Sequence, residues 1–130
     1  MKNIIDVING LSDLIALKPA TEKQISDAEN QLGLKFANDY KEYLAKFGAI
    51  MADGIELSGI AKSEHRNVVS LTQQEWGLNP QVSRKMYVVE NVCIDGILIW
   101  QNEKGEIYQS TSNTEPKKIA NSLVEYIGAL

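Results

Sequence analysis

The sequence predicts an α+β protein in which N-terminal helices and a C-terminal helix flank a twisted antiparallel sheet. Apolar residues recur with helical spacing twice within residues 21–48. Three runs rich in β-branched and aromatic residues follow within 86–109, separated by short turns. The order of helices, strands and a last helix is typical of α+β proteins. Since 130 residues are enough for one hydrophobic core, we expect a single domain over residues 1–130.

The N-terminal third is predicted to be helical. Helical spacing of apolar residues over 4–17 predicts a first helix. Thr21 and Gln24 have the spacing of a capping box, and Gly33 follows the last periodic residue of the second helix. The buried face of that helix is expected to comprise Ile25, Ala28 and Leu32.

A third helix follows a short apolar connector. Asn38 or Asp39 is expected to cap it, with Glu42 completing a capping box behind Asp39, and Gly48 is expected to end it. Its apolar face comprises Tyr40, Tyr43, Leu44 and Phe47.

Between Gly48 and Met86 the signals are shorter. Alternation over 55–60 predicts one or two short strands, and Val68–Val69 reads as a further strand piece. Thr72 and Glu75 have the spacing of a second capping box, which would open a short helix through Trp76.

The strongest strand signals form a three-stranded antiparallel meander. Its strands are expected at 86–89, 97–100 and 106–109, with turns at Asp95–Gly96 and 102–105. A polar loop over 110–116 would then lead to a closing helix. The apolar face of that helix is expected to comprise Ile119, Leu123, Tyr126 and Ile127.

The composition argues against several function classes. Thirteen basic and seventeen acidic residues give a net charge of −4, whereas a generic nucleic-acid binder has a basic excess. A single cysteine forms no internal disulfide, which fits a reducing compartment. The N-terminal sequence has no signal-peptide pattern, and no apolar run reaches the roughly 20 residues of a membrane span. We therefore expect a cytoplasmic protein that binds neither nucleic acid nor membrane.

The sequence contains no catalytic constellation. His65 is the one histidine and Cys93 the one cysteine, and their spacing is not that of metal ligands. The apolar neighbours of Cys93 predict a buried, inert thiol. The glycines at 54 and 59 lack the lysine and helix of a phosphate-binding loop. We expect no catalytic residues, no metal and no cofactor, with an unrecognised hydrolase as the remaining enzyme alternative.

Four segments, taken in order, resemble the SUKH superfamily, which includes the yeast Smi/Knr regulators and many bacterial immunity proteins. They are residues 21–33, 39–48, 95–108 and 119–127. Two positions depart from the family pattern. Ala37 stands where a proline is usual, and Gln101 stands where many members have an aspartate. The resemblance implies a cytosolic immunity protein that binds and neutralises a polymorphic or contact-dependent toxin, often a nuclease. It also implies the alternative of a regulatory or scaffold domain of the Smi/Knr type.

Charge patterning suggests where a toxin would bind. Residues 86–115 contain five acidic residues and one lysine, a net charge of −4. An acidic surface can cover the basic cleft of a nuclease, and aromatic residues are frequent interface hot spots. Trp100 is either such a hot spot or part of the core, and Trp76 either plugs the sheet edge or protrudes as an anchor. The predicted partner-binding set is Glu90, Asp95, Trp100, Glu103, Glu106 and Trp76. An exposed edge strand would allow a weak homodimer, so we expect a monomer or a weak homodimer.

Overall fold

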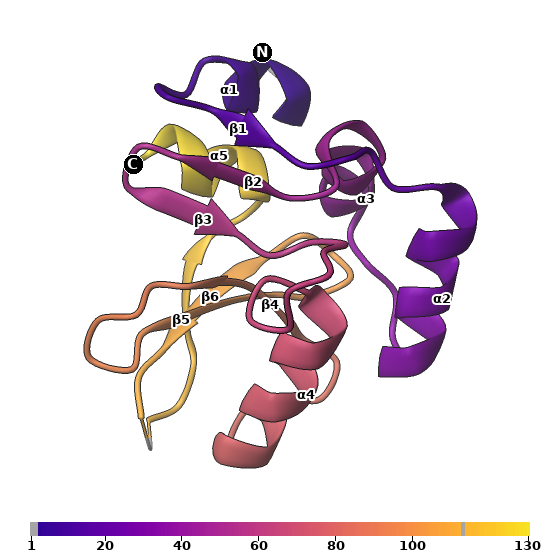
Figure 1. The fold of residues 1–130 in the computed structure, drawn as a ribbon. Coiled ribbons are helices and arrows are strands. Elements are labelled where there is room, and N and C mark those ends of the chain that lie inside the picture. Colours follow the sequence, from indigo (N-terminus) through magenta and orange to yellow (C-terminus); the bar gives the residue numbers. More distant parts are fainter. Residues whose placement is uncertain (1–2, 113) are drawn as a thin grey trace.

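The computed structural model describes residues 3–112 and 114–130 and confirms the α+β class (Figure 1). The elements in chain order are α1 (Ile4–Asn9), β1 (Ile15–Ala16), α2 (Glu22–Leu32), α3 (Asn38–Phe47), β2 (Ile50–Ala52), β3 (Ile55–Leu57), α4 (Val68–Leu78), β4 (Tyr87–Asn91), β5 (Leu98–Gln101), β6 (Ile107–Ser110), β7 (Lys117–Ala120) and α5 (Leu123–Gly128). Asn113, within the predicted polar loop, lies outside the described residues.

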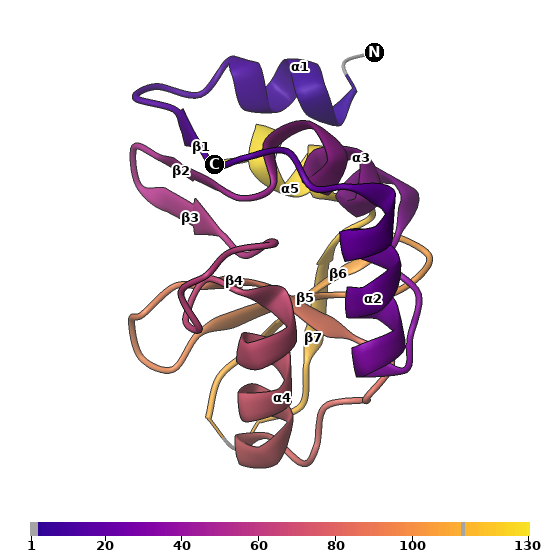
Figure 2. The same ribbon diagram turned by 45° about the vertical axis from the view of Figure 1, so that its right-hand side comes forward.

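The strands of the described residues form two antiparallel sheets that lie next to each other. One has the order β1-β2-β3 and the other the order β4-β5-β6-β7. Ser58, directly after β3, connects them, because its N–H donates to the Val89 carbonyl at 2.8 Å and its hydroxyl donates to the Val88 carbonyl at 2.6 Å. Figure 2 shows α2 and α4 side by side on one side of the larger sheet. The predicted meander is therefore confirmed, and β7 extends it by one strand.

The predicted boundaries of α2 are confirmed. Thr21 Oγ1 accepts from Gln24 N–H at 3.1 Å, and Gln24 Oε1 accepts from Thr21 N–H at 2.9 Å. Gly33 ends the helix in the left-handed conformation, with φ of 69°. Gly48 ends α3 as predicted, and only glycine fits there, since an added Cβ would lie 2.1 Å from the Lys18 carbonyl oxygen.

The prediction of a first helix over 4–17 was wrong beyond Asn9. Gly10 caps α1, and Asp13 has φ of 56°, which no helix accommodates. Ile15 and Ala16 instead pair with Met51 and Ile50 of β2. Pairing with a strand far along the sequence overrides the helical spacing there.

Val68–Val69 was predicted as a strand piece but forms the first turn of α4. Asn67 caps this helix, because its side-chain oxygen accepts from the N–H groups of Val69 and Ser70. The predicted capping box at Thr72 was therefore wrong. Thr72 lies within the helix, and its hydroxyl accepts from Val88 N–H at 3.0 Å.

The side-chain cap predicted for α3 is absent from the described structure. Ala37 occupies the N-cap position, and the Asp39 side chain bonds to residues outside α3 instead of capping it. One Asp39 carboxylate oxygen accepts from Gln101 Nε2 at 3.0 Å, and the other accepts from Leu123 N–H at 2.8 Å. Asp39 thus joins α3 to β5 and to the start of α5.

The closing helix begins later than predicted. Ile119 lies in β7, and Ser122 caps α5 by accepting from Glu125 N–H at 3.0 Å. The remaining predicted apolar residues of this helix, Leu123, Tyr126 and Ile127, are buried.

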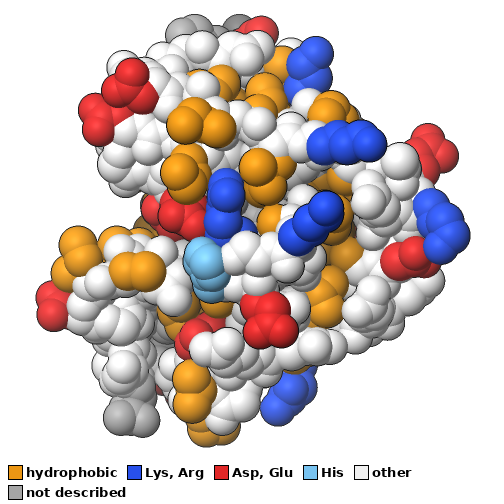
Figure 3. All heavy atoms as spheres, viewed as in Figure 1, with side chains coloured by type: hydrophobic (Ala, Val, Ile, Leu, Met, Phe, Trp, Pro, Cys, Tyr) orange, Lys and Arg blue, Asp and Glu red, His pale blue; other side chains and the backbone are white. Residues whose placement is uncertain are grey.

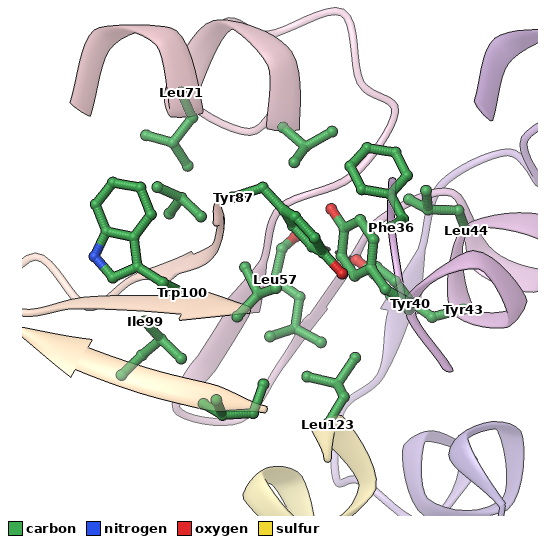
Figure 4. Close-up of a cluster of buried hydrophobic side chains, with 14 of the residues drawn as sticks. Phe36, Tyr40, Tyr43, Leu44, Leu57, Leu71, Tyr87, Ile99, Trp100 and Leu123 are labelled. Carbon is green, nitrogen blue, oxygen red and sulfur yellow. Dashed lines mark hydrogen bonds between the residues drawn. The ribbon is translucent and has the colours of Figure 1, made fainter. Parts of the chain in front are cut away.

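An aromatic cluster lies at the centre of the core (Figure 4). The ring centroids of Phe36 and Tyr87 are 4.7 Å apart, and those of Tyr40 and Tyr87 are 4.9 Å apart. Every tyrosine hydroxyl of the cluster has a partner. Tyr87 donates to Gln101 Oε1 at 2.7 Å and accepts from Ala37 N–H at 2.9 Å, and Tyr43 donates to the Ser58 carbonyl at 2.8 Å. Burial raises the pKa of these tyrosines well above the ordinary value, so the hydroxyls stay protonated.

This cluster gives Ala37 and Gln101 structural roles. Ala37 has φ of −65°, the value that proline imposes, yet its N–H is needed by Tyr87. Gln101 is fully buried and bridges Tyr87, Asp39 and the Gly105 carbonyl. A neutral amide can donate to Asp39 there, whereas an aspartate would repel it.

Candidate functional site

A surface groove of about 750 Å³ lies along β6. Tyr108 of β6 is half-buried in it, and the chain segments that follow α2 and α4 form its sides. The predicted residues Glu103 and Glu106 both line the groove. The structure therefore brings these two together beside an aromatic side chain.

The rim of the groove at the β5–β6 turn is built by Asn102. Its Oδ1 accepts from the N–H groups of Lys104 and Glu106 at 3.1 and 3.0 Å, and its Nδ2 donates to Glu106 Oε1 at 2.9 Å. Lys118 Nζ donates to the other Glu106 oxygen at 2.9 Å. These bonds hold the pKa of the Glu106 carboxyl below its usual value, first through Asn102 and then through Lys118. Glu106 is consequently ionised and fixed in position.

The charges along the groove are balanced. Three lysines and three glutamates line it: Lys35, Lys85, Lys104, Glu103, Glu106 and Glu115. The net charge of −4 calculated for segment 86–115 is therefore not the charge of this surface. Lysines from distant segments face the groove, and Glu90 contributes nothing to the exposed charge because it is buried.

Three residues of the predicted set are buried. Trp100 is fully buried, and its Nε1–H donates to Ser110 Oγ at 2.9 Å. Trp76 packs under Arg84 and donates to the Met86 carbonyl at 2.9 Å. Glu90 accepts from the Tyr126 hydroxyl, and burial raises the pKa of its carboxyl. In this structure these three side chains support the sheet from within.

Asp95 lies at the opposite end of β5 from Glu103. Asp95 and Gly96 have φ of 53° and 69°, and Ile97 N–H donates to the Ile94 carbonyl at 3.0 Å. This is the tight hairpin turn that the Asp-Gly dipeptide predicts. The prediction for Cys93 was wrong: its side chain is exposed and its backbone is left-handed, with φ of 62°. The turn lifts Cys93 out of the core.

The structure brings Cys93 and His65 to the wall of one small cavity, but each has a different partner. A His65 ring nitrogen lies 2.7 Å from Ser63 Oγ, and the Cys93 thiol donates to the Asn91 carbonyl at 3.6 Å. Within residues 3–112 and 114–130 there is no group of three or more His, Cys, Asp or Glu side chains that could hold a metal ion. In the same residues, no helix is long and apolar enough to cross a membrane.

The fold is a small α+β structure with a surface groove lined by Tyr108 and by six charged side chains. The family model described as SMI1-KNR4 cell-wall (SUKH_5) matches residues 1–129, and the chain belongs to this family. The resemblance inferred from the four sequence segments is thereby confirmed.

Two individual proteins resemble the chain. A crystal structure of a protein from Pseudomonas syringae pv. tomato has a TM-score of 0.74 at 18% identity, covering 95% of this chain and 92% of that one. At that identity the likeness shows the fold alone. A protein from Bacillus subtilis (strain 168), described as uncharacterized protein YnaB, is 52% identical over 40 residues. That match spans 30% of this chain and 28% of the Bacillus protein.

Proposed function

We propose that the chain is an immunity protein that neutralises a cognate polymorphic or contact-dependent toxin by forming a stoichiometric complex. The observation that carries the proposal is the Tyr108 groove with its six charged side chains. The groove can receive a protruding segment of a folded partner. The family also supports a binding role. The proposed protein acts by binding, without catalysis or a cofactor.

The mechanism follows from the charge arrangement. Charges of both signs at a rim select a partner with the complementary pattern and repel others, and they accelerate encounter. Tyr108 supplies a rigid aromatic contact at the centre. For a nuclease toxin, the exposed carboxylates of Glu103 and Glu115 at the groove would face the basic substrate cleft, so that the complex excludes the nucleic acid.

The first test is growth rescue in the cytoplasm of a bacterial host. The C-terminal portion of the reading frame directly upstream would be induced with and without this chain. Killing that this chain alone relieves supports the proposal. A harmless neighbour, or killing that persists in spite of the folded chain, would contradict it.

The second test measures binding of that toxin by charge-reversed variants. Glu103→Lys with Glu115→Lys should weaken binding about tenfold, or ~1.4 kcal/mol, and change its salt dependence. The matched control reverses Glu22 and Glu42, two exposed helical glutamates that do not line the groove. Equal affinity of both folded variants would remove the groove from the proposal. Sedimentation of the free chain would distinguish the expected monomer from a weak homodimer.

The second candidate function is regulation or scaffolding with an endogenous protein partner, which the cell-wall description of the family favours. This alternative predicts a growth or envelope defect on deletion even where no toxin is present. Dispensability without the toxin would favour the immunity role.

A further inference from the structure

A second cavity, of about 100 Å³, lies near the Asn91 end of β4, whereas the groove lies near the Met86 end. Its wall is formed by the end of β3, the segment before α4 and the β4–β5 hairpin, and it contains Arg66, His65 and Cys93. The face that carries the histidine is hollowed in Figure 3, with acidic, basic and hydrophobic side chains around the hollow. None of the residues used in the proposed groove contributes to it.

Arg66 has hydrogen-bonding capacity that the described chain leaves unused. Its side chain is 17% exposed, and both Nε and Nη2 are buried without a hydrogen-bond partner among the described residues. Glu56 Oε1 forms an ion pair at 3.4 Å from Nε, but this contact does not meet hydrogen-bond geometry. Leaving a buried donor unsatisfied costs about 1–3 kcal/mol, and more when the group is charged.

The two unused donors specify the chemistry of a ligand. Nε–H and the Nη2–H on the same edge of a guanidinium point in parallel, and this edge accepts a carboxylate through two hydrogen bonds. The volume restricts the choice further. The cavity is large enough for several waters or for one carboxylate with its adjoining carbon. A nucleotide is too large.

The part of the wall formed by the β4–β5 hairpin is preformed. Cys93 has a left-handed backbone with φ of 62°, and its N–H donates to Asn91 Oδ1 at 2.9 Å. Asn91 and Cys93 both line the cavity. A preformed wall lowers the ordering cost of binding.

We propose that the Arg66 cavity is a receptor for a single carboxylate, which binds the Nε–Nη2 edge of the guanidinium. In the structure both nitrogens are closed off from solvent and Glu56 is ion-paired at Nε, so the partly exposed Glu56 side chain must move aside when an acid binds, which lowers the affinity. The carboxylate belongs either to a free small acid or to an acidic residue or chain terminus of a protein. The proposal does not depend on the toxin-binding role.

The test is an NMR titration with sodium formate, compared with sodium chloride at equal ionic strength. We expect formate to shift the Arg66 Nε–H resonance and the amides of Asn91 and Cys93 saturably, in the millimolar range. Glu56→Gln should tighten formate binding about threefold to tenfold, whereas Arg66→Gln should abolish it. Arg84→Gln, which removes an exposed guanidinium elsewhere, is the matched control and should bind as wild type.

Identical responses to formate and chloride, or shifts that never saturate in either wild type or Glu56→Gln, would overturn the proposal and leave a water-filled cavity. Since Glu56→Gln retains Arg66, a folding defect of Arg66→Gln does not affect this outcome. Short peptides with a free C-terminal carboxylate, compared with their amides, then identify the source. Competition by the carboxylate form alone indicates a protein-borne ligand, and binding of formate without peptide competition indicates a free small acid.

Discussion

The two turns at the ends of β5 differ in how their polar groups are used. At the Asn102–Gly105 end, the Asn102 side chain makes three hydrogen bonds, and the Glu106 carboxylate has two partners, Asn102 and Lys118. At the Cys93–Gly96 end, three residues have positive φ, and the neighbouring Arg66 has two donors without partners in the described chain. The first turn is fixed by its own bonds and presents a rigid rim. Beside the second turn, Arg66 has unused donors that an external group can satisfy.

This difference separates two ways of building a recognition surface. A satisfied turn contributes shape and fixed charge, so its mutation should chiefly affect stability and rim geometry. An unsatisfied cavity contributes little stability, and its mutation should chiefly affect what binds.

The largest expected effect concerns Trp100, on the strand β5 that connects the two turns. Trp100→Ala should lower the free energy of unfolding by about 3–5 kcal/mol, because the fully buried indole fills the space between the sheet and α4. Denaturant unfolding followed by circular dichroism measures this loss. Leu78→Ala, at an exposed position, should change stability little, and an equal loss in both variants would contradict the assignment.

A smaller effect compares the turns directly. Asn102→Ala should cost about 1–2 kcal/mol, since it removes the side-chain bonds that organise the β5–β6 turn. Asn91→Ala removes one side-chain bond at the other end and should cost about 0.5 kcal/mol. Equal losses in matched unfolding experiments would refute the proposed asymmetry between the turns.

The smallest effect concerns Glu90, on β4 close to the cavity end. Burial raises the pKa of its carboxyl above the ordinary value. The stability gained from protonating it is therefore fully present below the unfolded-state pKa and is lost as the pH rises through the folded-state pKa. Glu90→Gln keeps an acceptor for Tyr126 and should flatten this decline, making the variant more stable than wild type near neutral pH. Parallel stability curves from pH 4 to 8 would contradict the raised pKa.

Short sequence motifs correctly predicted those features that neighbouring residues in the chain stabilise. The capping box at Thr21, the left-handed Gly33 and the Asp95–Gly96 turn each depend on neighbouring residues, and all three are confirmed. Ile15, Val68 and Ile119 were placed in the wrong type of element. Pairing with a distant strand decides the conformation at Ile15, an unrecognised asparagine cap decides it at Val68, and the pairing of β7 with the preceding strand β6 decides it at Ile119.

The same contrast between neighbouring and distant residues applies to the candidate sites. Glu103 and Glu106 could be proposed because acidic residues at a turn are visible in the sequence, and both line the groove. Lys35 and Lys85 were not, since they reach the groove from other segments. No role for Arg66 could be predicted from the sequence, because an unpartnered donor exists only once the surrounding chain is folded.

The packing of α1 against α5 has a consequence for how the protein is made. Ile4 and Ile8 of α1 are buried, and residues near the end of the chain contribute to their cover. The Asp39 carboxylate likewise has its hydrogen bond from Leu123 N–H only after residue 123 has been synthesised. Residues 4–9 emerge from the ribosome long before residues 123–128, so the part of α1 that α5 covers stays exposed in the nascent chain until α5 has emerged. Translation pauses just before residues 123–128 should therefore lengthen the interval in which chaperones or proteases can bind the unfinished protein.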